Sequence, residues 1–429
     1  MIVEERPITY HIVTLGAMTR EGDTLAEITE QNAEGEQHTI TLRVPAGLPG
    51  EHVTIAVEAP PAPRAGRRKH RWKPRPPRVW ITEIHEPSPL RVQAPCPVFG
   101  TCGGCQLQHM QYEAQLEWKR SVVGQLLNEI GGFVDPPLLS TVPCDIPWHY
   151  RNHMRFSVNR SGQAGLTARG THRVLPLTTC PIAHEQINRA LHVLSPHANA
   201  QPQVLIRCGA ANGQMLIQPQ PAPAVAQQLA EAGLDLRTET MEEVLADETF
   251  RIRPSSFFQT NTAQAEKMAQ MVLDGLLSST QQSSRALTIV DAYCGVGTFA
   301  LLLARHVDKV IAIEESASAI KDAQWNLRTA ANVEILKGKV EDMLPGLASQ
   351  IDGLVIDPPR AGCQQVVLDA LVQHPVARIV YVSCDPSTLA RDLNILCHLH
   401  PIYRLRSVQP LDMFPQTAHI ECVAVLEQV

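Results

Sequence analysis

The sequence predicts a protein of three domains: a small β-barrel over residues 1–88, a mixed α+β domain over 89–256 and a doubly wound, mostly parallel α/β domain over 257–429. Three observations support this. The chain of 429 residues is long enough for two or three separate cores. Short β segments separated by Gly, Asn and Pro turn signals fill the first part. Strands and helices alternate regularly from about residue 262 onward.

The composition is typical of a globular protein, with 44% apolar and 19% charged residues. No stretch approaches the roughly 18 consecutive apolar residues that a membrane-spanning helix requires. The first residues include Glu4 and Glu5 and lack the basic and then apolar pattern of a secretory leader, so we expect a cytoplasmic protein. Eleven cysteines, an odd number, favour reduced thiols over a disulfide framework.

The first two domains are expected to contain several short strands and one long helix. Barrels of a few short strands commonly bind oligonucleotides. The middle domain is expected to have a helix near 112–130 and strands at 154–158 and 203–208. The strands expected in the barrel cover 11–15, 24–28, 38–44, 52–57 and, after a long basic loop, 78–84.

The net charge of −6 conceals one strongly basic segment. Eight Lys and Arg residues and no acidic residue lie between Arg64 and Arg78, so this segment carries +8 and the rest of the chain −14. Basic side chains attract phosphates, and Trp72 and Trp80 offer faces on which unpaired bases can stack. We therefore expect contact with a nucleic acid here. A solvated, proline-rich linker is the alternative.

A buried strand, a glycine-containing turn and a helix over 287–305 predict a ligand pocket. Gly295 and Gly297 let the backbone turn tightly and approach a ligand, and the helix start offers unpaired N–H groups. A second strand ends at Glu314, 23 residues after Asp291, where a carboxylate can accept hydrogen bonds from the ribose of a nucleoside cofactor. The glycines also fit a permissive dinucleotide pattern, so a dehydrogenase and a purely structural turn are alternatives.

Two later strands end at Asp357 and Cys384, and both ends should face the ligand crevice at the carboxyl edge of the sheet. Hydride transfer requires no thiol there, whereas methyl transfer to a poorly nucleophilic pyrimidine carbon does. Asp385 is expected to cap a helix with Pro386 in its first turn, which should favour ionisation of Cys384 near the positive helix end. A buried, inert cysteine is the alternative.

Glu421 lies among apolar residues in the last expected strand, at 417–426. Apolar surroundings disfavour the charged carboxylate and raise its basicity, which suits removal of a proton from a substrate carbon. The alternative is a structural carboxylate that pairs with Arg360 or His419.

Cys96, Cys102 and Cys105 have the spacing C-x5-C-x2-C, and Cys180 offers a fourth thiolate. Four thiolates suit tetrahedral zinc or an iron–sulfur cluster. A compact trio with a remote Cys-Pro is closer to a [4Fe-4S] arrangement than to the paired motifs of zinc sites. Zinc and unrelated thiols are the alternatives.

Six motifs, in order, resemble those of the RNA uracil-5 methyltransferases, and the resemblance covers nearly the whole chain. The most similar branch is that of the bacterial ribosomal RNA enzymes with an iron–sulfur cluster. Residues 8–88 resemble the small RNA-binding TRAM barrel of these enzymes. The motifs are Cys-Pro-x4-Cys-Gly-Gly-Cys-Gln-Leu-Gln-His from residue 96, Ser-Phe-Phe-Gln-Thr-Asn from 256, Asp-Ala-Tyr-Cys-Gly-Val-Gly-Thr-Phe from 291, Asp-Pro-Pro-Arg from 357, Val-Ser-Cys-Asp-Pro-Ser-Thr-Leu-Ala-Arg-Asp from 382 and His-Ile-Glu from 419.

The resemblance implies a Rossmann-like C-terminal domain that uses S-adenosylmethionine to methylate carbon 5 of a uridine in 23S ribosomal RNA. Cys384 would be the nucleophile and Glu421 the base. The cysteines that would hold a [4Fe-4S] cluster are Cys96, Cys102, Cys105 and Cys180. The residues that would bind S-adenosylmethionine are Gln259, Tyr293, Thr298, Glu314 and Asp357.

Two positions differ from common forms of the family: Thr298 stands where many members carry Asn, and Asp385 replaces a frequent Asn. Two functional alternatives remain, namely the same reaction on a tRNA uridine and a cluster-bearing RNA-binding protein without catalysis. We expect a monomer with RNA as its partner and no membrane association.

Overall fold

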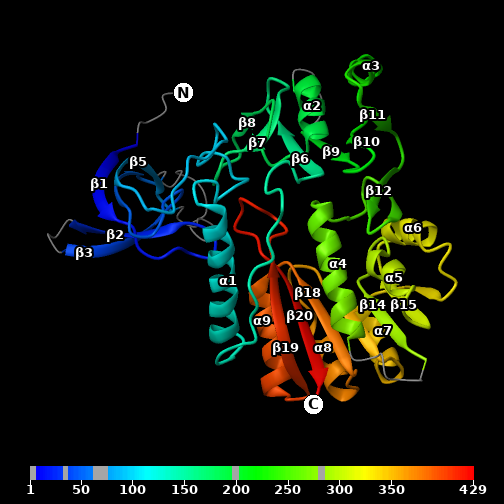
Figure 1. Cartoon of the computed structure of the whole chain (residues 1–429). Coiled ribbons are helices and arrows are strands. Elements are labelled where there is room, and N and C mark those ends of the chain that lie inside the picture. Colours follow the sequence, from blue (N-terminus) through cyan, green and yellow to red (C-terminus); the bar gives the residue numbers. More distant parts are fainter. Residues whose placement is uncertain (1–5, 32–36, 61–75, 196–201, 279–285) are drawn as a thin grey trace, which may run out of the picture. The chain divides into compact units, whose positions relative to one another are not determined.

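The computed structural model describes residues 6–31, 37–60, 76–195, 202–278 and 286–429 (Figure 1). The chain divides into two compact units. The first unit consists of residues 1–115 and 416–418, and the second of 116–415 and 419–429. Of the predicted basic segment, the part up to residue 75, with Trp72 and seven of the eight basic residues, lies outside the described residues. The predicted boundaries of three domains stay a prediction.

Five antiparallel strands are described in the first unit, in a sheet of order β1-β4-β5 and a second sheet in which β2 pairs with β3. Apolar side chains alternate along these strands, and those of both sheets, among them Val13, Ile28 and Val53, share one core. The strand segments expected from the sequence are confirmed, and closure into a TRAM barrel stays a prediction. The strands are β1 (Ile8–Thr14), β2 (Thr24–Gln31), β3 (Gln37–Val44), β4 (His52–Glu58) and β5 (Arg78–Glu86).

The part of the chain between the barrel-like strands and residue 252 mixes helices and strands. Helix α1 (Tyr112–Glu129) begins in the first unit and continues in the second. A six-stranded sheet of order β11-β10-β9-β6-β7-β8 follows, and then a hairpin of β12 and β13. The predicted helix and both predicted strands of this part are confirmed. The elements are β6 (His153–Val158), β7 (Ala164–Thr167), β8 (Val174–Pro176), α2 (Glu185–Leu194), β9 (Gln203–Cys208), β10 (Gln214–Gln218), α3 (Pro223–Glu231), β11 (Asp235–Arg237), β12 (Met241–Leu245) and β13 (Glu248–Ile252).

The C-terminal part is built on a seven-stranded, Rossmann-like sheet of order β16-β15-β14-β17-β18-β20-β19. Strands β14 to β18 run parallel, and β20 runs antiparallel to both β18 and β19. The predicted doubly wound α/β fold is confirmed, although the last strand begins at residue 421 rather than 417. The elements are α4 (Thr262–Leu277), β14 (Thr288–Ala292), α5 (Thr298–Leu303), β15 (Lys309–Glu314), α6 (Ala317–Asn326), β16 (Val333–Lys337), α7 (Val340–Leu347), β17 (Gly353–Ile356), α8 (Gln365–Gln373), β18 (Arg378–Ser383), α9 (Pro386–Asn394), β19 (Tyr403–Leu411) and β20 (Glu421–Gln428).

Helices cover both faces of this sheet (Figure 1). Along β18, Ile379 and Tyr381 pack into one core with α7, α8, α9 and the second-unit part of α1. Val380 and Val382 pack into the other core with α4, α5 and α6. All four side chains are fully buried. A strand buried on both faces reads as a continuous apolar run, which is why the sequence identified these strands.

Strand order reverses beside β14, which has β15 on one side and β17 on the other. In open parallel sheets, ligands bind at such a switch point, outside the carboxyl ends of the strands. The turns that follow β14, β15, β17 and β18 therefore form the edge at which a site is expected.

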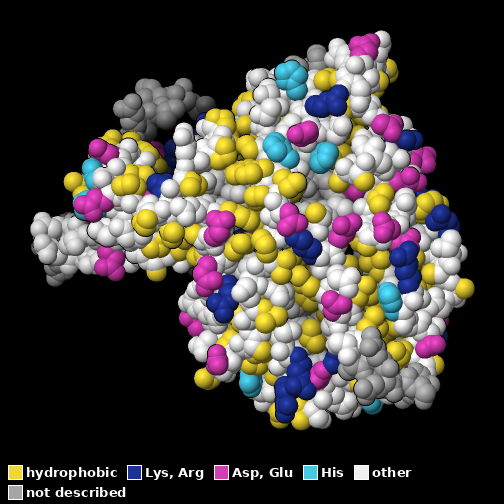
Figure 2. Space-filling model, in the orientation of Figure 1, with side chains coloured by type: hydrophobic (Ala, Val, Ile, Leu, Met, Phe, Trp, Pro, Cys, Tyr) yellow, Lys and Arg dark blue, Asp and Glu magenta, His cyan; other side chains and the backbone are white. Residues whose placement is uncertain are grey.

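Two further observations concern possible contact with a membrane and the distribution of charge on the surface. In the described ranges, no helix is both long and apolar enough to cross a membrane. On the face drawn in Figure 2, Lys and Arg side chains of the second unit are interspersed with Asp and Glu side chains rather than gathered in one patch.

Candidate active site

The turn after β14 adopts left-handed backbone conformations at Tyr293, Gly295 and Gly297, with φ of 63°, 58° and 89°. Glycine tolerates this region freely, and a Cβ on Gly297 would approach Leu327 Cδ1 to 3.0 Å. A Cβ on Gly295 would meet no atom within 4 Å. The backbone at Gly295 thus borders open space, as close approach to a ligand requires.

Glu314 at the end of β15 is held against this turn. Its Oε2 accepts the Gly295 N–H at 3.0 Å, and its Oε1 accepts the Ser316 N–H at 2.7 Å. A carboxylate has about four acceptor positions, so about two remain for donors such as the hydroxyls of a ribose.

Three of the predicted cofactor residues directly follow one row of paired residues in the sheet. Ala292 pairs with Ile313 on one side and Ile356 on the other. Tyr293, Glu314 and Asp357 are the residues that directly follow these three paired residues in the chain. The Tyr293 hydroxyl donates to Glu341 Oε1 at 3.0 Å.

This edge of the sheet is rich in carboxyl groups that disfavour one another's charge. Burial, with the charges of Asp357 and Glu314, raises the pKa of Asp291 to about 8. Burial also raises the pKa of Asp357 to about 7. Asp291 Oδ2 accepts the Ala300 N–H at 2.8 Å, whereas its buried Oδ1 has no hydrogen-bond partner among the residues that the structure describes. A cationic ligand relieves such repulsion, and S-adenosylmethionine carries a sulfonium charge, so these residues fit it.

The remaining predicted cofactor residues lie at helix starts. Thr298 is the first residue of α5. Gln259 is partly buried and precedes Asn261, the N-cap of α4, and its carbonyl oxygen accepts the Asn152 Nδ2–H at 3.3 Å.

Cys384 lies between β18 and α9 and is partly exposed. Asp385 caps α9 as predicted, accepting the Ser387 N–H at 2.9 Å, and Pro386 opens the helix. Burial and the charges of Glu421 and Asp357 raise the pKa of the Cys384 thiol to about 11, and Arg360 opposes them. The expectation that the helix start would favour the thiolate is therefore wrong, because burial and two carboxylates outweigh a helix end worth roughly 0.3–1 kcal/mol.

Glu421 begins β20 and lies close enough to Cys384 for its charge to raise the pKa of that thiol. Strand β18 pairs antiparallel with β20 so that Ser383, the residue before Cys384, lies opposite Cys422, the residue after Glu421. Glu421 is 3% exposed. Burial and Asp357 raise the pKa of its carboxyl well above the ordinary value, as the apolar sequence context predicts, and Arg360 opposes this.

The four cysteines of the predicted cluster are divided between the two units. Cys96, Cys102 and Cys105 belong to the first unit and Cys180 to the second. Burial and, to a smaller extent, the charge of Cys96 raise the pKa of the Cys102 thiol. The Gly104 N–H donates to Cys102 Sγ at 3.4 Å. Among the residues that the structure describes, no three His, Cys, Asp or Glu side chains form a group that could hold a metal ion. The structure therefore does not support the predicted four-thiolate site.

Sequence reasoning missed one charged pair in the second unit. Lys119 on α1 and Asp412 after β19 are fully buried, with Nζ and Oδ1 2.5 Å apart. Lys119 also lowers the pKa of His419, which burial and cationic neighbours together bring to about 4. No local signal could identify the pair, since 293 residues separate the partners.

Comparison with known proteins identifies the family. Residues 228–429 match the family described as tRNA (Uracil-5-)-methyltransferase. An uncharacterized RNA methyltransferase of Gloeobacter violaceus is 36% identical over 400 residues, covering 81% of this chain and 85% of the relative. Another, from Halalkalibacterium halodurans, is 30% identical over 469 residues, covering 97% and 96%.

One solved structure shares the fold over nearly the full length. The Pyrococcus abyssi tRNA (uracil-54, C5)-methyltransferase in complex with S-adenosyl-L-homocysteine has a TM-score of 0.68 and 23% identity, covering 97% of this chain and 99% of that one. This chain therefore belongs to the family of S-adenosylmethionine-dependent RNA (uracil-5-)-methyltransferases.

Proposed function

We propose that this protein transfers a methyl group from S-adenosylmethionine to carbon 5 of a specific uridine in 23S ribosomal RNA. The observation that carries the proposal is that Cys384 follows the end of β18 beside the start of β20, where Glu421 lies close enough for its charge to raise the pKa of the thiol. Asp357 lies at the same edge and raises the pKa of both. Methylation of pyrimidine carbon 5 requires a thiol and a buried base next to the cofactor, and this edge of the sheet offers all three.

S-adenosylmethionine supplies a methyl group on a positively charged sulfur. In this proposal the carboxylate of Glu314 accepts from the ribose hydroxyls, and Asp357 balances positive charge. The full set of residues that contact it is Gln259, Tyr293, Thr298, Glu314 and Asp357, supported by the register row and by the open space at Gly295.

The protein's own groups perform the covalent steps. The Cys384 thiolate adds through Sγ to carbon 6 of the uracil, and the electron pair displaced from the C5–C6 bond makes carbon 5 nucleophilic enough to take the methyl group. Glu421 then removes the proton from carbon 5. The C5–C6 double bond re-forms as the bond between Sγ and carbon 6 breaks, which releases Cys384.

The Cys384 proton must leave before Sγ adds, because the pKa of the thiol is about 11. Asp357, with a pKa of about 7, is matched to accept a proton at neutral pH. Arg360 favours the charged forms of both Cys384 and Glu421. We therefore propose that Arg360 stabilises the ionised forms of Cys384 and Glu421.

RNA recognition is assigned to the first unit. Arg78 stacks over the Trp80 ring at 5.2 Å, a cation–π pair at the described end of the basic segment. Strands β1 to β5 would form a TRAM barrel within residues 1–88, followed by the cluster domain over 89–256 and the methyltransferase domain over 257–429. The chain would act as a monomer.

A [4Fe-4S] cluster on Cys96, Cys102, Cys105 and Cys180 is part of this proposal, resting on donor chemistry and spacing alone. No step of the reaction uses it. Metal analysis after anaerobic purification tests it: about four irons per chain, with broad absorption near ~400 nm, would support it. Stoichiometric zinc without iron would refute it.

The central test offers the protein two substrates separately, 23S ribosomal RNA and tRNA transcribed without modification. With S-adenosylmethionine, nucleoside mass spectrometry should find 5-methyluridine in the ribosomal RNA. Cys384→Ala should abolish it while sparing RNA affinity, and Cys397→Ala, a partly buried cysteine outside the site, should leave it unchanged. If 5-methyluridine forms in tRNA alone, the substrate is tRNA and not ribosomal RNA. RNA binding without product from either substrate would favour a non-catalytic binding protein.

A further inference from the structure

Four successive backbone carbonyls between β19 and the loop before β20 each accept a hydrogen bond from a side chain. We call residues 412–415 the strap. The bonds are Gln264 Nε2 to Asp412 O at 2.9 Å, Asn261 Nδ2 to Met413 O at 3.2 Å, Lys119 Nζ to Phe414 O at 3.1 Å and Tyr150 Oη to Pro415 O at 3.0 Å.

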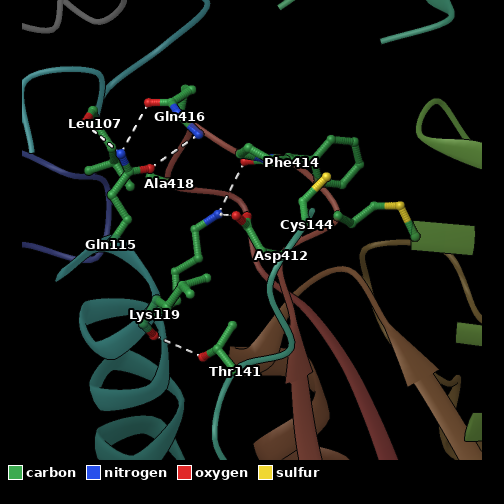
Figure 3. Close-up of polar contacts among 12 residues, drawn as sticks. Leu107, Gln115, Lys119, Thr141, Cys144, Asp412, Phe414, Gln416 and Ala418 are labelled. Carbon is green, nitrogen blue, oxygen red and sulfur yellow. Dashed lines mark hydrogen bonds and ion pairs between the residues drawn. The ribbon is translucent and has the colours of Figure 1, made fainter. Parts of the chain in front are cut away.

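The donors come from separate parts of the second unit. Lys119 lies on α1, Asn261 and Gln264 lie at the start of α4, and Tyr150 precedes β6. Figure 3 shows Lys119 extended from α1 so that Nζ meets both the Asp412 carboxylate and the Phe414 carbonyl. Helices from both faces of the sheet therefore hold one short stretch of backbone.

The strap lies outside regular structure, so the sheet does not satisfy its carbonyls. Buried carbonyls without partners are costly, and side-chain donors at every position fix one path for the backbone. Asp412 adds a second attachment, because its carboxylate pairs with Lys119 while its N–H donates to Val142 O at 3.0 Å. Lys119, Asp412, Asn261 and Gln264 are all buried, at 3% exposure or less.

The chain runs from the strap to Glu421 in six residues. Residues 416–418 are held within the first unit, where Gln416 O accepts the N–H groups of Gln106 and Leu107 at 3.1 and 3.0 Å. Gln416 also exchanges two hydrogen bonds with the Gln115 side chain. Within the second unit, Leu411, the residue before the strap, pairs with Glu421 in the register of β19 and β20, so the strap begins directly beside Glu421.

We infer that the buried Lys119–Asp412 pair is a positioning device for Glu421: by holding the strap, it places the Glu421 carboxylate for removal of the carbon 5 proton. This inference rests on the proposed function. Lys119 and Asp412 do not touch the substrate. Loosening the strap should slow proton removal, whereas addition of Cys384 and methyl transfer, which depend on the turns after β14, β17 and β18, should proceed.

The test uses a double variant, Lys119→Met with Asp412→Leu, which removes the pair and the bond to Phe414 O without leaving a buried charge. The substrate is a mixture of unmodified 23S ribosomal RNA and tRNA transcripts, made with uridine or with 5-fluorouridine. Fluorine on carbon 5 cannot be removed as a cation, so 5-fluorouridine RNA stays attached after methyl transfer and reports every step before Glu421 acts.

Three results are expected of the double variant. Turnover on uridine RNA should fall at least tenfold, with KM for RNA within twofold of the parent. Covalent protein–RNA adduct, seen on a denaturing gel, should accumulate on uridine RNA. The rate of adduct formation on 5-fluorouridine RNA should stay within threefold of the parent, which also shows that the variant is folded.

Two further variants calibrate the result. Tyr150→Phe removes only the bond to Pro415 O. On uridine RNA it should accumulate more adduct than the parent but less than the double variant. Lys267→Met removes a partly exposed lysine of α4 that bonds Pro143 O and Asp145, and should accumulate none.

Glu421→Gln separates failure of the inference from failure of the proposed function. If Glu421→Gln gives no adduct on uridine RNA, the role of Glu421 itself is wrong. If Glu421→Gln accumulates adduct and the double variant does not, only the inference is overturned. Parallel loss of turnover and of 5-fluorouridine adduct would also overturn it, because the pair would then support the whole site.

Discussion

The turn after β14 and the strap before Glu421 are held in opposite ways. At the turn, carboxylates accept from backbone N–H groups: Glu314 from Gly295 and Ser316, and Asp291 from Ala300. In the strap, backbone carbonyls accept from side-chain donors. Partners at the turn lie within 19 residues of each other, whereas every strap donor is at least 148 residues from its acceptor. Local sequence therefore specifies the cofactor side, and long-range packing specifies the side of the proposed base.

The largest expected difference concerns stability. Lys119→Met alone removes the cationic partner of the buried Asp412 carboxylate, so the free energy of unfolding should fall by about 3–5 kcal/mol. Lys267→Met removes a pair with Asp145 in which both side chains are partly or largely exposed, and should cost no more than ~1 kcal/mol. Urea unfolding measures both. Equal losses would mean that the strap pair is no stronger than a surface pair.

A smaller effect should follow from altering the turn. Gly297→Ala forces a side chain into a left-handed conformation and against Leu327, at a cost of about 1–2 kcal/mol. We expect affinity for S-adenosylmethionine to fall about tenfold. Gly346→Ala, at a helical position where a Cβ meets no atom within 4 Å, is the matched control and should leave affinity unchanged. If calorimetry shows that Gly297→Ala binds S-adenosylmethionine as tightly as the parent, the turn does not contribute to cofactor binding.

The carboxyl groups at the cofactor edge should make binding of S-adenosylmethionine depend on pH. Asp357 is neutral below its pKa of about 7 and ionised above it, and a sulfonium cation favours the ionised form. Affinity for S-adenosylmethionine should therefore rise about tenfold, or ~1.4 kcal/mol, between pH 6 and pH 8.

S-adenosylhomocysteine, which lacks the sulfonium charge, is the control ligand, and its affinity should change less. Asp357→Asn should flatten the profile for S-adenosylmethionine. A profile that keeps its slope in Asp357→Asn would assign the titration to another group.

The smallest effect expected is on the reactivity of Cys384. Glu421 raises the pKa of this thiol, so Glu421→Gln should lower it and speed alkylation by iodoacetamide a few-fold at pH 8. Peptide mass spectrometry follows Cys384 separately from the other cysteines. Slower alkylation would show that Glu421 instead promotes ionisation of the thiol.

The cofactor side could be predicted because its signals are local. Gly295 and Gly297 mark the turn, and the apolar runs before Glu314, Asp357 and Cys384 mark strand ends that must meet at one edge of a parallel sheet. Strand boundaries were predicted less well where pairing decides them. The last strand begins at residue 421, and residues 417 and 418 of the predicted strand belong to the first unit instead.

Other features could not be predicted because they depend on distant partners. The antiparallel pairing of β20 with β18 brings the start of β20 beside the end of β18, close to Cys384, and the sequence did not specify that pairing. Lys119 resembles an ordinary surface lysine until the fold places Asp412 against it. The Cys384 pKa was predicted in the wrong direction because the carboxyl groups that oppose ionisation arrive from other strands.

The central claim is that the sulfur of Cys384 bonds to the substrate pyrimidine, and peptide mapping tests it most directly. Protein incubated with S-adenosylmethionine and 5-fluorouridine RNA, then digested with protease and nuclease, should yield a peptide in which Cys384 carries a methylated 5-fluorouridine nucleotide. A nucleotide on any other residue, or methylation of uridine RNA by Cys384→Ala, would contradict the account.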